Sequence, residues 1–266
     1  MKTGYRILLS LNAGAPASLV EQALEALWPG MAEELVGLFI EDSEIFEMAR
    51  LPVAREIRRD GGRPRPPDAA SMEREFRQQA ARLREIFERR ARHLARRCAF
   101  RVARSSPAML LREASEEFDV LLLADSPERP EYHWAIRRQL ALLIQAGPRM
   151  IVIARPAQPF ARRIAVLCDG SEAGQAALRT AQELAAGRDL ELLLLLPPGG
   201  EAPPSGPGEE NWRVRRLPGL EATSISGLLR AEGAAFLVLP RRIAAAQPAV
   251  IAELVDRAPC SVILSG

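Results

Sequence analysis

The chain has 266 residues, of which 48% are hydrophobic, 26% are charged and only 5% are aromatic, a composition typical of a globular protein with an aliphatic core. Its 36 basic and 34 acidic residues leave a net charge of +2, so the charge balance does not call for nucleic acid or an anionic membrane as a partner. The longest apolar run, residues 192–196, is far shorter than the ~20 residues needed to span a bilayer.

Three cysteines, Cys98, Cys168 and Cys260, lie far apart in the sequence, each in or beside an apolar run. This spacing fits neither a disulfide framework nor a metal site, and it predicts buried, reduced thiols in a cytoplasmic protein. The apolar segment near the N-terminus is shorter than the core of a typical signal peptide, so we interpret it as the first strand.

Strands and helices alternate along the first part of the chain. The pattern predicts strands at 5–11, 34–40, 99–103, 120–124 and 150–154, and helices at 16–27, 69–97, 107–117 and 134–145. Residues 41–59 read as a short helix with an ordered loop, and residues 60–68 as a loop. Such alternation is typical of a doubly wound, mainly parallel sheet, the α/β class of Rossmann-like domains.

The second part repeats this order after a linker at 155–162. It predicts strands at 163–168, 190–196, 212–216, 235–239 and 261–264, and helices at 172–186, 222–231 and 248–256. The paired first strands are 157 positions apart and the paired fourth strands 116, so the second copy is shorter by about 41 residues. We therefore predict two tandem domains, 1–156 and 160–266. The second is abbreviated chiefly by loss of the counterpart of the Arg-rich helix, 69–97, and of the loop before it.

Two short motifs flank the first and last strands of the second copy. Asp169-Gly170-Ser171 follows the first strand of the second copy, and Ala258-Pro259-Cys260 precedes its last strand, where the first copy has Gly147-Pro148. In this order the chain resembles the universal stress protein family in its tandem form. The resemblance implies two Rossmann-like domains, a role in stress adaptation as a binding or regulatory protein, and an internal pseudo-dimer joined through the last strands, 150–154 and 261–264.

One class of that family binds ATP through a glycine-rich loop after the fourth strand, whose backbone amides hold the phosphates. Here there is no glycine between Gly233 and Gly266, or between Gly62 and Gly147. The aspartate that contacts the nucleoside in the family remains only as Asp169, with Asn12 near that position in the first copy. The resemblance therefore argues against ATP binding in the usual way, and we predict no cofactor, with ATP or AMP as the open alternative.

If a nucleotide does bind, the second copy offers the residues for it: Asp169, Gly170, Ser171, Arg241 and Arg242. Asp169 either touches a ligand at the carboxyl end of the sheet or caps the following helix. Arg241 and Arg242 either hold an anion or form a solvated pair in a loop. Asp125 and Arg129 occupy the matching place in the first copy.

Nothing in the sequence supports an enzyme. The only histidines, His93 and His133, have no nucleophile or carboxylate at a recognisable motif spacing, and no cluster has the spacing of metal ligands. The arginines of helix 69–97 are interpreted as a solvated face with ion pairs such as Glu73–Arg77 and Glu85–Arg89, rather than a nucleic-acid site. We predict a non-enzymatic protein with a protein or small-ligand partner, no nucleic acid and no membrane; a further homodimer stays open.

Overall fold

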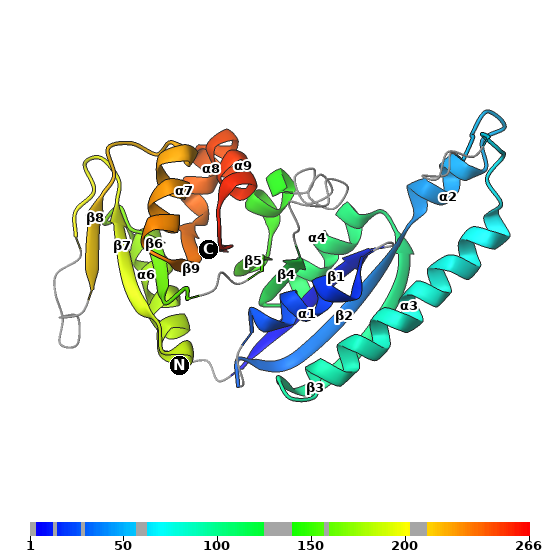
Figure 1. Ribbon diagram of the computed structural model, residues 1–266, viewed down its shortest axis with the longest axis horizontal. Helices are drawn as coiled ribbons and strands as arrows, with labels where there is room; N and C mark the ends of the chain where they lie inside the picture. The colour runs from blue at the N-terminus through cyan, green and yellow to red at the C-terminus, as the bar shows by residue number, and fades with distance from the viewer. Residues whose placement is uncertain are drawn as a thin grey trace.

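A computed structural model describes residues 4–12, 15–27, 30–56, 63–124, 140–156, 160–202 and 212–266. They form one sheet of ten strands with helices on both faces, and the molecule is elongated along this sheet (Figure 1). The strand and helix pattern confirms the predicted α/β class.

The first half alternates strands and helices as expected. Its elements are β1 (Tyr5–Asn12), α1 (Ala17–Glu25), β2 (Ala32–Asp42), α2 (Ser43–Ala49), α3 (Ala69–Ala91), β3 (Ala95–Ser105), α4 (Pro107–Glu117), β4 (Val120–Ala124) and β5 (Met150–Ala154). Residues 140–146 are also helical, whereas the earlier part of the predicted helix 134–145 lies outside the described residues.

The second half follows the same order, and its described residues include no counterparts of α2 and α3. Its elements are β6 (Arg163–Leu167), α6 (Glu172–Arg188), β7 (Glu191–Leu196), β8 (Arg213–Arg216), α7 (Ala222–Ala231), β9 (Ala234–Pro240), α8 (Arg241–Ala246), α9 (Pro248–Arg257) and β10 (Ser261–Ser265). Only residues 197–212 separate β7 from β8, and of these 203–211 lie outside the description. The span is too short for a helix as long as α3.

The strand order is β3-β2-β1-β4-β5-β10-β9-β6-β7-β8, which reads the same from either end when each half is numbered from its own first strand. Neighbouring strands within each half are parallel. The halves join where β5 and β10 pair antiparallel, with Ile153 opposite Val262 and Met150 opposite Ser265. The predicted pairing of the two last strands is thus confirmed, and it turns two sheets into one.

Two apolar layers cover the faces of this sheet, and each runs through both halves. One layer contains α1, α3 and α6, with Val20, Phe87 and Ala181 among its fully buried side chains. The other contains α4, α7 and α9, with Leu111 and Leu229 fully buried. Because the layers cross the β5–β10 seam, the two halves share a core.

The boundary between α3 and β3 differs from the prediction. The helix was expected to continue to residue 97, but α3 ends at Ala91 and β3 begins at Ala95. A turn closed by the Leu94 N–H on the Ala91 carbonyl separates them. From Ala95 onward β3 pairs with the whole length of β2, and this ladder outweighs the helical spacing of the local sequence.

Two further expectations are corrected. The residues after β9 were expected to form a loop, but Arg241–Ala246 form helix α8. All three cysteines were expected to be buried; Cys168 and Cys260 are, whereas Cys98 is exposed, because it lies on the edge strand β3.

Polar contacts also cross the seam. Arg188 of α6 donates through its Nη2 atom to the carbonyls of Glu25 and Leu27 at the C-terminal end of α1, and its guanidinium lies 4.9 Å from the Phe236 ring centroid. The Tyr5 hydroxyl donates to Glu183 Oε2 of α6 at 2.9 Å. The helix that follows the first strand in one half is therefore tied to its counterpart in the other.

Burial, and secondly the hydrogen bond to the Glu183 carboxylate, raise the pKa of Tyr5 to about 12. Because the unfolded phenol titrates near its ordinary value of 10, we expect the free energy of unfolding to fall as the pH rises from about 10 to about 12. The chain has two tyrosines, so Tyr132→Phe leaves Tyr5 alone for an absorbance titration of tyrosinate. A titration midpoint near 10 in this variant would contradict the burial of the Tyr5 hydroxyl.

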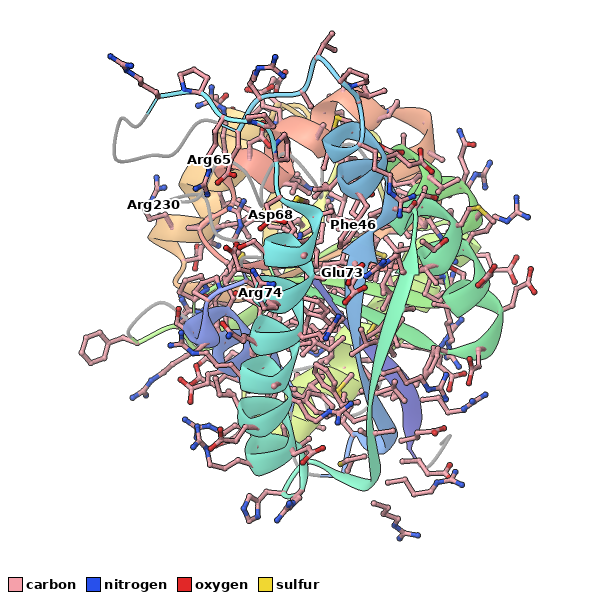
Figure 2. The ribbon with its side chains drawn as sticks, turned by 90° about the vertical axis from the view of Figure 1, so that its right-hand side faces the viewer. Phe46, Arg65, Asp68, Glu73, Arg74 and Arg230 are labelled. Atoms are coloured by element: carbon pink, nitrogen blue, oxygen red, sulfur yellow. The ribbon has the colours of Figure 1, made fainter. Side chains whose placement is uncertain are left out.

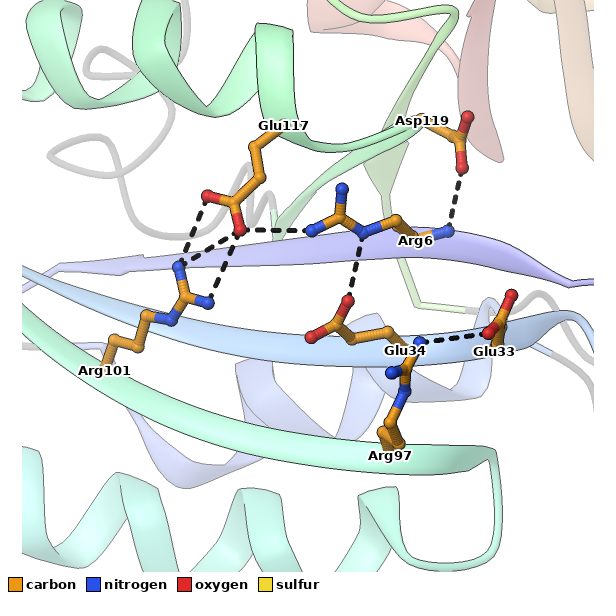
Figure 3. Close-up of polar contacts among 7 residues, drawn as sticks. All are labelled: Arg6, Glu33, Glu34, Arg97, Arg101, Glu117 and Asp119. Carbon is orange, nitrogen blue, oxygen red and sulfur yellow. Dashed lines mark hydrogen bonds and ion pairs between the residues drawn. The ribbon is translucent and has the colours of Figure 1, made fainter.

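Surface ion pairs lie on the first half, toward the amino-terminal ends of its strands. Arg6 contacts Glu34 at 3.0 Å and Glu117 at 3.1 Å, and Glu117 also pairs with Arg101 (Figure 3). Exposed pairs of this kind contribute ~1 kcal/mol or less each. On the edge strand β3, Arg97 pairs with Glu33 and Arg101 with Glu117, and Arg104, near the carboxyl-terminal end, pairs with Glu41 and Glu73.

Candidate functional site

The candidate site lies at the carboxyl-terminal edge of the second half, where the strand order reverses. In the order β10-β9-β6-β7-β8, the chain leaves β6 toward one side and β9 toward the other. Open α/β sheets bind ligands in the crevice at such a switch point. Asp169 follows β6 and Arg241 follows β9, so the two residues leave neighbouring strands at this edge.

The predicted Asp169-Gly170-Ser171 turn is an interlocked helix start. Ser171 is the N-cap of α6, and its Oγ atom accepts from the Gly174 N–H at 3.1 Å. Asp169 Oδ1 in turn accepts from the Ser171 hydroxyl at 2.6 Å and from the Ser171 N–H at 3.1 Å. Asp169 was predicted either to touch a ligand or to cap the following helix. The structure favours a role in the helix start, in which Ser171 is the cap and Asp169 holds Ser171 in place.

Two glycines allow this turn to be so compact. Gly170 has a φ of +83°, a conformation that favours glycine, and the closest approach to a Cβ placed there is the Glu201 carbonyl at 3.6 Å. A Cβ on Gly174 would lie 2.5 Å from Asp169 Oδ1. Gly174 was not among the residues predicted for this site, although its place three residues after the capping Ser171 was a readable signal.

Arg241 does not behave as a solvated loop residue. It is half-buried, its Nη1 atom donates to the Gly147 carbonyl of the first half at 2.6 Å, and its guanidinium lies directly against Gly266. Burial lowers the pKa of Arg241 from its ordinary value. This side chain therefore joins the two halves, and the sequence could not show it because the contact depends on how β5 and β10 pair.

Arg242 is exposed, and within the described ranges no hydrogen bond or ion pair links Arg241 or Arg242 to Asp169. The structure thus brings the predicted residues to one edge of the sheet without joining them in a network. Asp169 and Arg241 are engaged by other parts of the protein, whereas the Arg242 side chain is exposed.

The matching edge of the first half is only partly described. Asn12 ends β1 where Asp169 follows β6, and its Oδ1 atom is buried without a hydrogen-bond partner among the described residues. Asp125, Arg129 and His133 lie outside the described residues.

The remaining predicted chemistry can be checked on α3. Glu73 and Arg77 pair at 3.1 Å as expected, whereas Glu85 and Arg89 do not. His93 is exposed in the turn after α3. In the described part of the chain no group of three or more His, Cys, Asp or Glu side chains could hold a metal ion. The described helices include none that combines the length and the apolar character needed to cross a membrane.

Comparison by sequence finds no matching protein-family model and no matching curated protein. Comparison of structures does find relatives of the fold. A universal stress protein from Archaeoglobus fulgidus superposes with a TM-score of 0.60 at 12% identity, covering 98% of this chain and 96% of its own. A functionally unknown protein from Pseudomonas aeruginosa gives a TM-score of 0.54 at 12% identity, covering 98% and 92%. The resemblance inferred from the sequence is confirmed at the level of the fold, over nearly the whole chain.

Proposed function

We propose that this chain, which has the fold of the universal stress proteins, is a stress-associated binding or regulatory protein that acts in the cytoplasm through contacts with a protein or a small ligand. It has no enzymatic activity, and it does not hold ATP in a glycine-rich loop. The fold is the premise of this proposal, and the local sequence after β9 supplies its direction.

The observation that carries the proposal is helix α8. It begins at Arg241, directly after the last residue of β9, and no glycine lies between Gly233 and Gly266. Amides that cradle phosphates need a backbone free of side chains at close approach. Here Arg241, Arg242 and Ile243 project side chains from that stretch, and the helix uses its own backbone groups for hydrogen bonding.

The engagement of Asp169 points the same way. A carboxylate that accepts two hydrogen bonds from Ser171 is less available to bind the hydroxyls of a ribose. The alternative proposal is an adenine-nucleotide sensor in which Asp169 releases Ser171 and Arg242 holds a phosphate.

A thermal-shift series separates the two proposals. With Mg-ATP, AMP or cyclic AMP in about 100-fold excess over a micromolar Kd, a bound ligand would add ~2.7 kcal/mol and raise the Tm by several degrees. We expect no saturable shift and no hydrolysis of ATP. A saturable shift with ATP that disappears in Arg242→Ala, whose side chain is exposed and forms no hydrogen bond or ion pair with the described residues, would overturn the first proposal in favour of the sensor.

A further inference from the structure

One part of the first half projects away from the sheet. Helix α2 and the start of α3 lie at one far end of the molecule (Figure 1), and their Phe46 and Phe76 side chains belong to the apolar layer that contains α1, α3 and α6. We call the four exposed apolar side chains of this region the tip surface: Ile45, Met48, Leu51 and Val53, which are 37%, 55%, 54% and 80% exposed.

The exposed apolar side chains of the tip surface are clustered in the sequence. Of the eight large hydrophobic side chains exposed in the described part of the chain, four fall within the nine residues from Ile45 to Val53. The other four lie singly on β3, α4, β8 and the connection between the halves. Single exposed apolar residues are ordinary on a protein surface, whereas a contiguous group marks an interaction site.

The tip is held rigidly enough to present a fixed surface. Phe46, on the inner side of α2, packs against Phe76 with ring centroids 5.0 Å apart, and the Arg104 guanidinium lies 4.1 Å from the Phe46 ring centroid. Asp68 caps α3 through the Ala70 N–H (Figure 2). A surface organised in advance loses less conformational entropy on binding.

Two backbone hydrogen bonds between Glu56 and Arg65, of 2.7 and 3.1 Å, join the end of the segment that carries Leu51 and Val53 to the residues that lead into α3. The Glu56 and Arg65 side chains also pair, at 3.2 Å. Residues 50–56 are therefore anchored at one end by α2 and at the other by this bridge.

Unpaired charges of both signs lie beside the tip surface. Glu44 and Glu47 are exposed on α2, Arg50 is exposed directly after α2, and Arg63 is exposed two residues before Arg65. Within the described ranges the side chains of these four residues form no ion pair or hydrogen bond, in contrast to Glu41, which pairs with Arg104 at 2.8 Å. The tip thus carries an apolar centre with acidic and basic neighbours.

We propose that the tip surface is an isologous interface for a second copy of this chain. In a two-fold contact the same patch meets itself, so the patch must carry both halves of each complementary pair. The tip surface has exposed acidic side chains, Glu44 and Glu47, and exposed basic side chains, Arg50 and Arg63, near it in the sequence, so it carries both signs of charge as this requirement demands. The acidic side chains of one copy would then face the basic side chains of the other. A nucleic acid or an anionic membrane would instead favour a patch of one sign.

Sedimentation equilibrium of the full chain tests the proposal directly. We expect a dimer of twice the 29.2 kDa chain mass that dissociates on dilution. The double variant Met48→Glu/Leu51→Glu should weaken it by ~30-fold or more, as loss of interface anchors does. Met109→Glu on α4, where Met109 is 59% exposed, is the matched control and should leave the dimer unchanged. Circular dichroism of each variant checks that it is folded.

A charge exchange identifies the contact as two-fold. Glu44→Arg/Glu47→Arg and Arg50→Glu/Arg63→Glu should each be monomeric alone, because like charges then face each other across the axis, and the two variants should form a heterodimer when mixed. A wild-type chain that stays monomeric at ~100 µM would overturn the proposal. So would a dimer that survives Met48→Glu/Leu51→Glu, or a monomer that binds anionic lipid vesicles through the tip. Because none of these readouts involves nucleotide, they are independent of the proposed function.

Discussion

Replacing Arg155 by alanine is expected to lower the free energy of unfolding by about 3 kcal/mol, which corresponds to a fall in Tm of roughly 6–10 °C. Arg155 follows β5 and is only 5% exposed. Its Nη1 atom donates to the Ala258 carbonyl and its Nη2 atom to those of Val255 and Asp256. These are carbonyls at the C-terminal end of α9, which have no partner within the helix and favour a cation.

The variant would leave several of these carbonyls buried without a donor, and it would remove one of the links between the halves. Urea unfolding followed by circular dichroism measures the effect. Arg162→Ala is the matched control: its side chain is exposed and makes no contact among the described residues, so the change should stay within ~0.5 kcal/mol. A loss below ~1 kcal/mol for Arg155→Ala would show that water replaces the guanidinium and that the seam does not depend on it.

Two glycine-to-alanine variants in helices are expected to act in opposite directions. At Gly174, in the first turn of α6, a Cβ would lie 2.5 Å from Asp169 Oδ1 and 3.0 Å from the Asp169 backbone nitrogen. The turn would have to open, and we expect a loss of about 2 kcal/mol. At Gly227, in α7, a Cβ would meet nothing within 4 Å, so alanine should stabilise the helix by ~0.5–1 kcal/mol.

Both glycine variants can be followed by the same urea titration. Adding Asp169→Ala to Gly174→Ala removes the closer of the two contacts and should recover part of the loss, since only the backbone contact remains. If Gly174→Ala were as stabilising as Gly227→Ala, Asp169 would not be packed on the first turn of α6, and its carboxylate would be free for a ligand.

The sequence was sufficient where local chemistry determines structure. Helix α4 runs over the predicted residues because Ser106 caps it and Pro107 begins it. β4 and β5 were likewise predicted to the residue from short apolar runs. The α3–β3 boundary was wrong because pairing with β2, which is distant in sequence, decides where β3 begins.

The candidate site divides in the same way. The sequence predicted that Asp169 and Arg241 lie at one edge of the sheet, since the carboxyl ends of parallel strands share an edge. It could not show that Arg241 reaches Gly147, because that contact exists only once β5 and β10 have joined the halves. Helix α8 was missed because the seven residues between Pro240 and Pro248, six of them helical, are too few for a readable period. The predicted domain boundary, 156 to 160, stays a prediction.

The two ends of the molecule are unlike, because α2 and α3 occur in the first half alone. Each chain therefore carries one tip surface and can make one contact through it. If the second half also carried a tip surface, chains that bind one another through it would form an open polymer. A single tip surface in each chain limits the assembly to two chains.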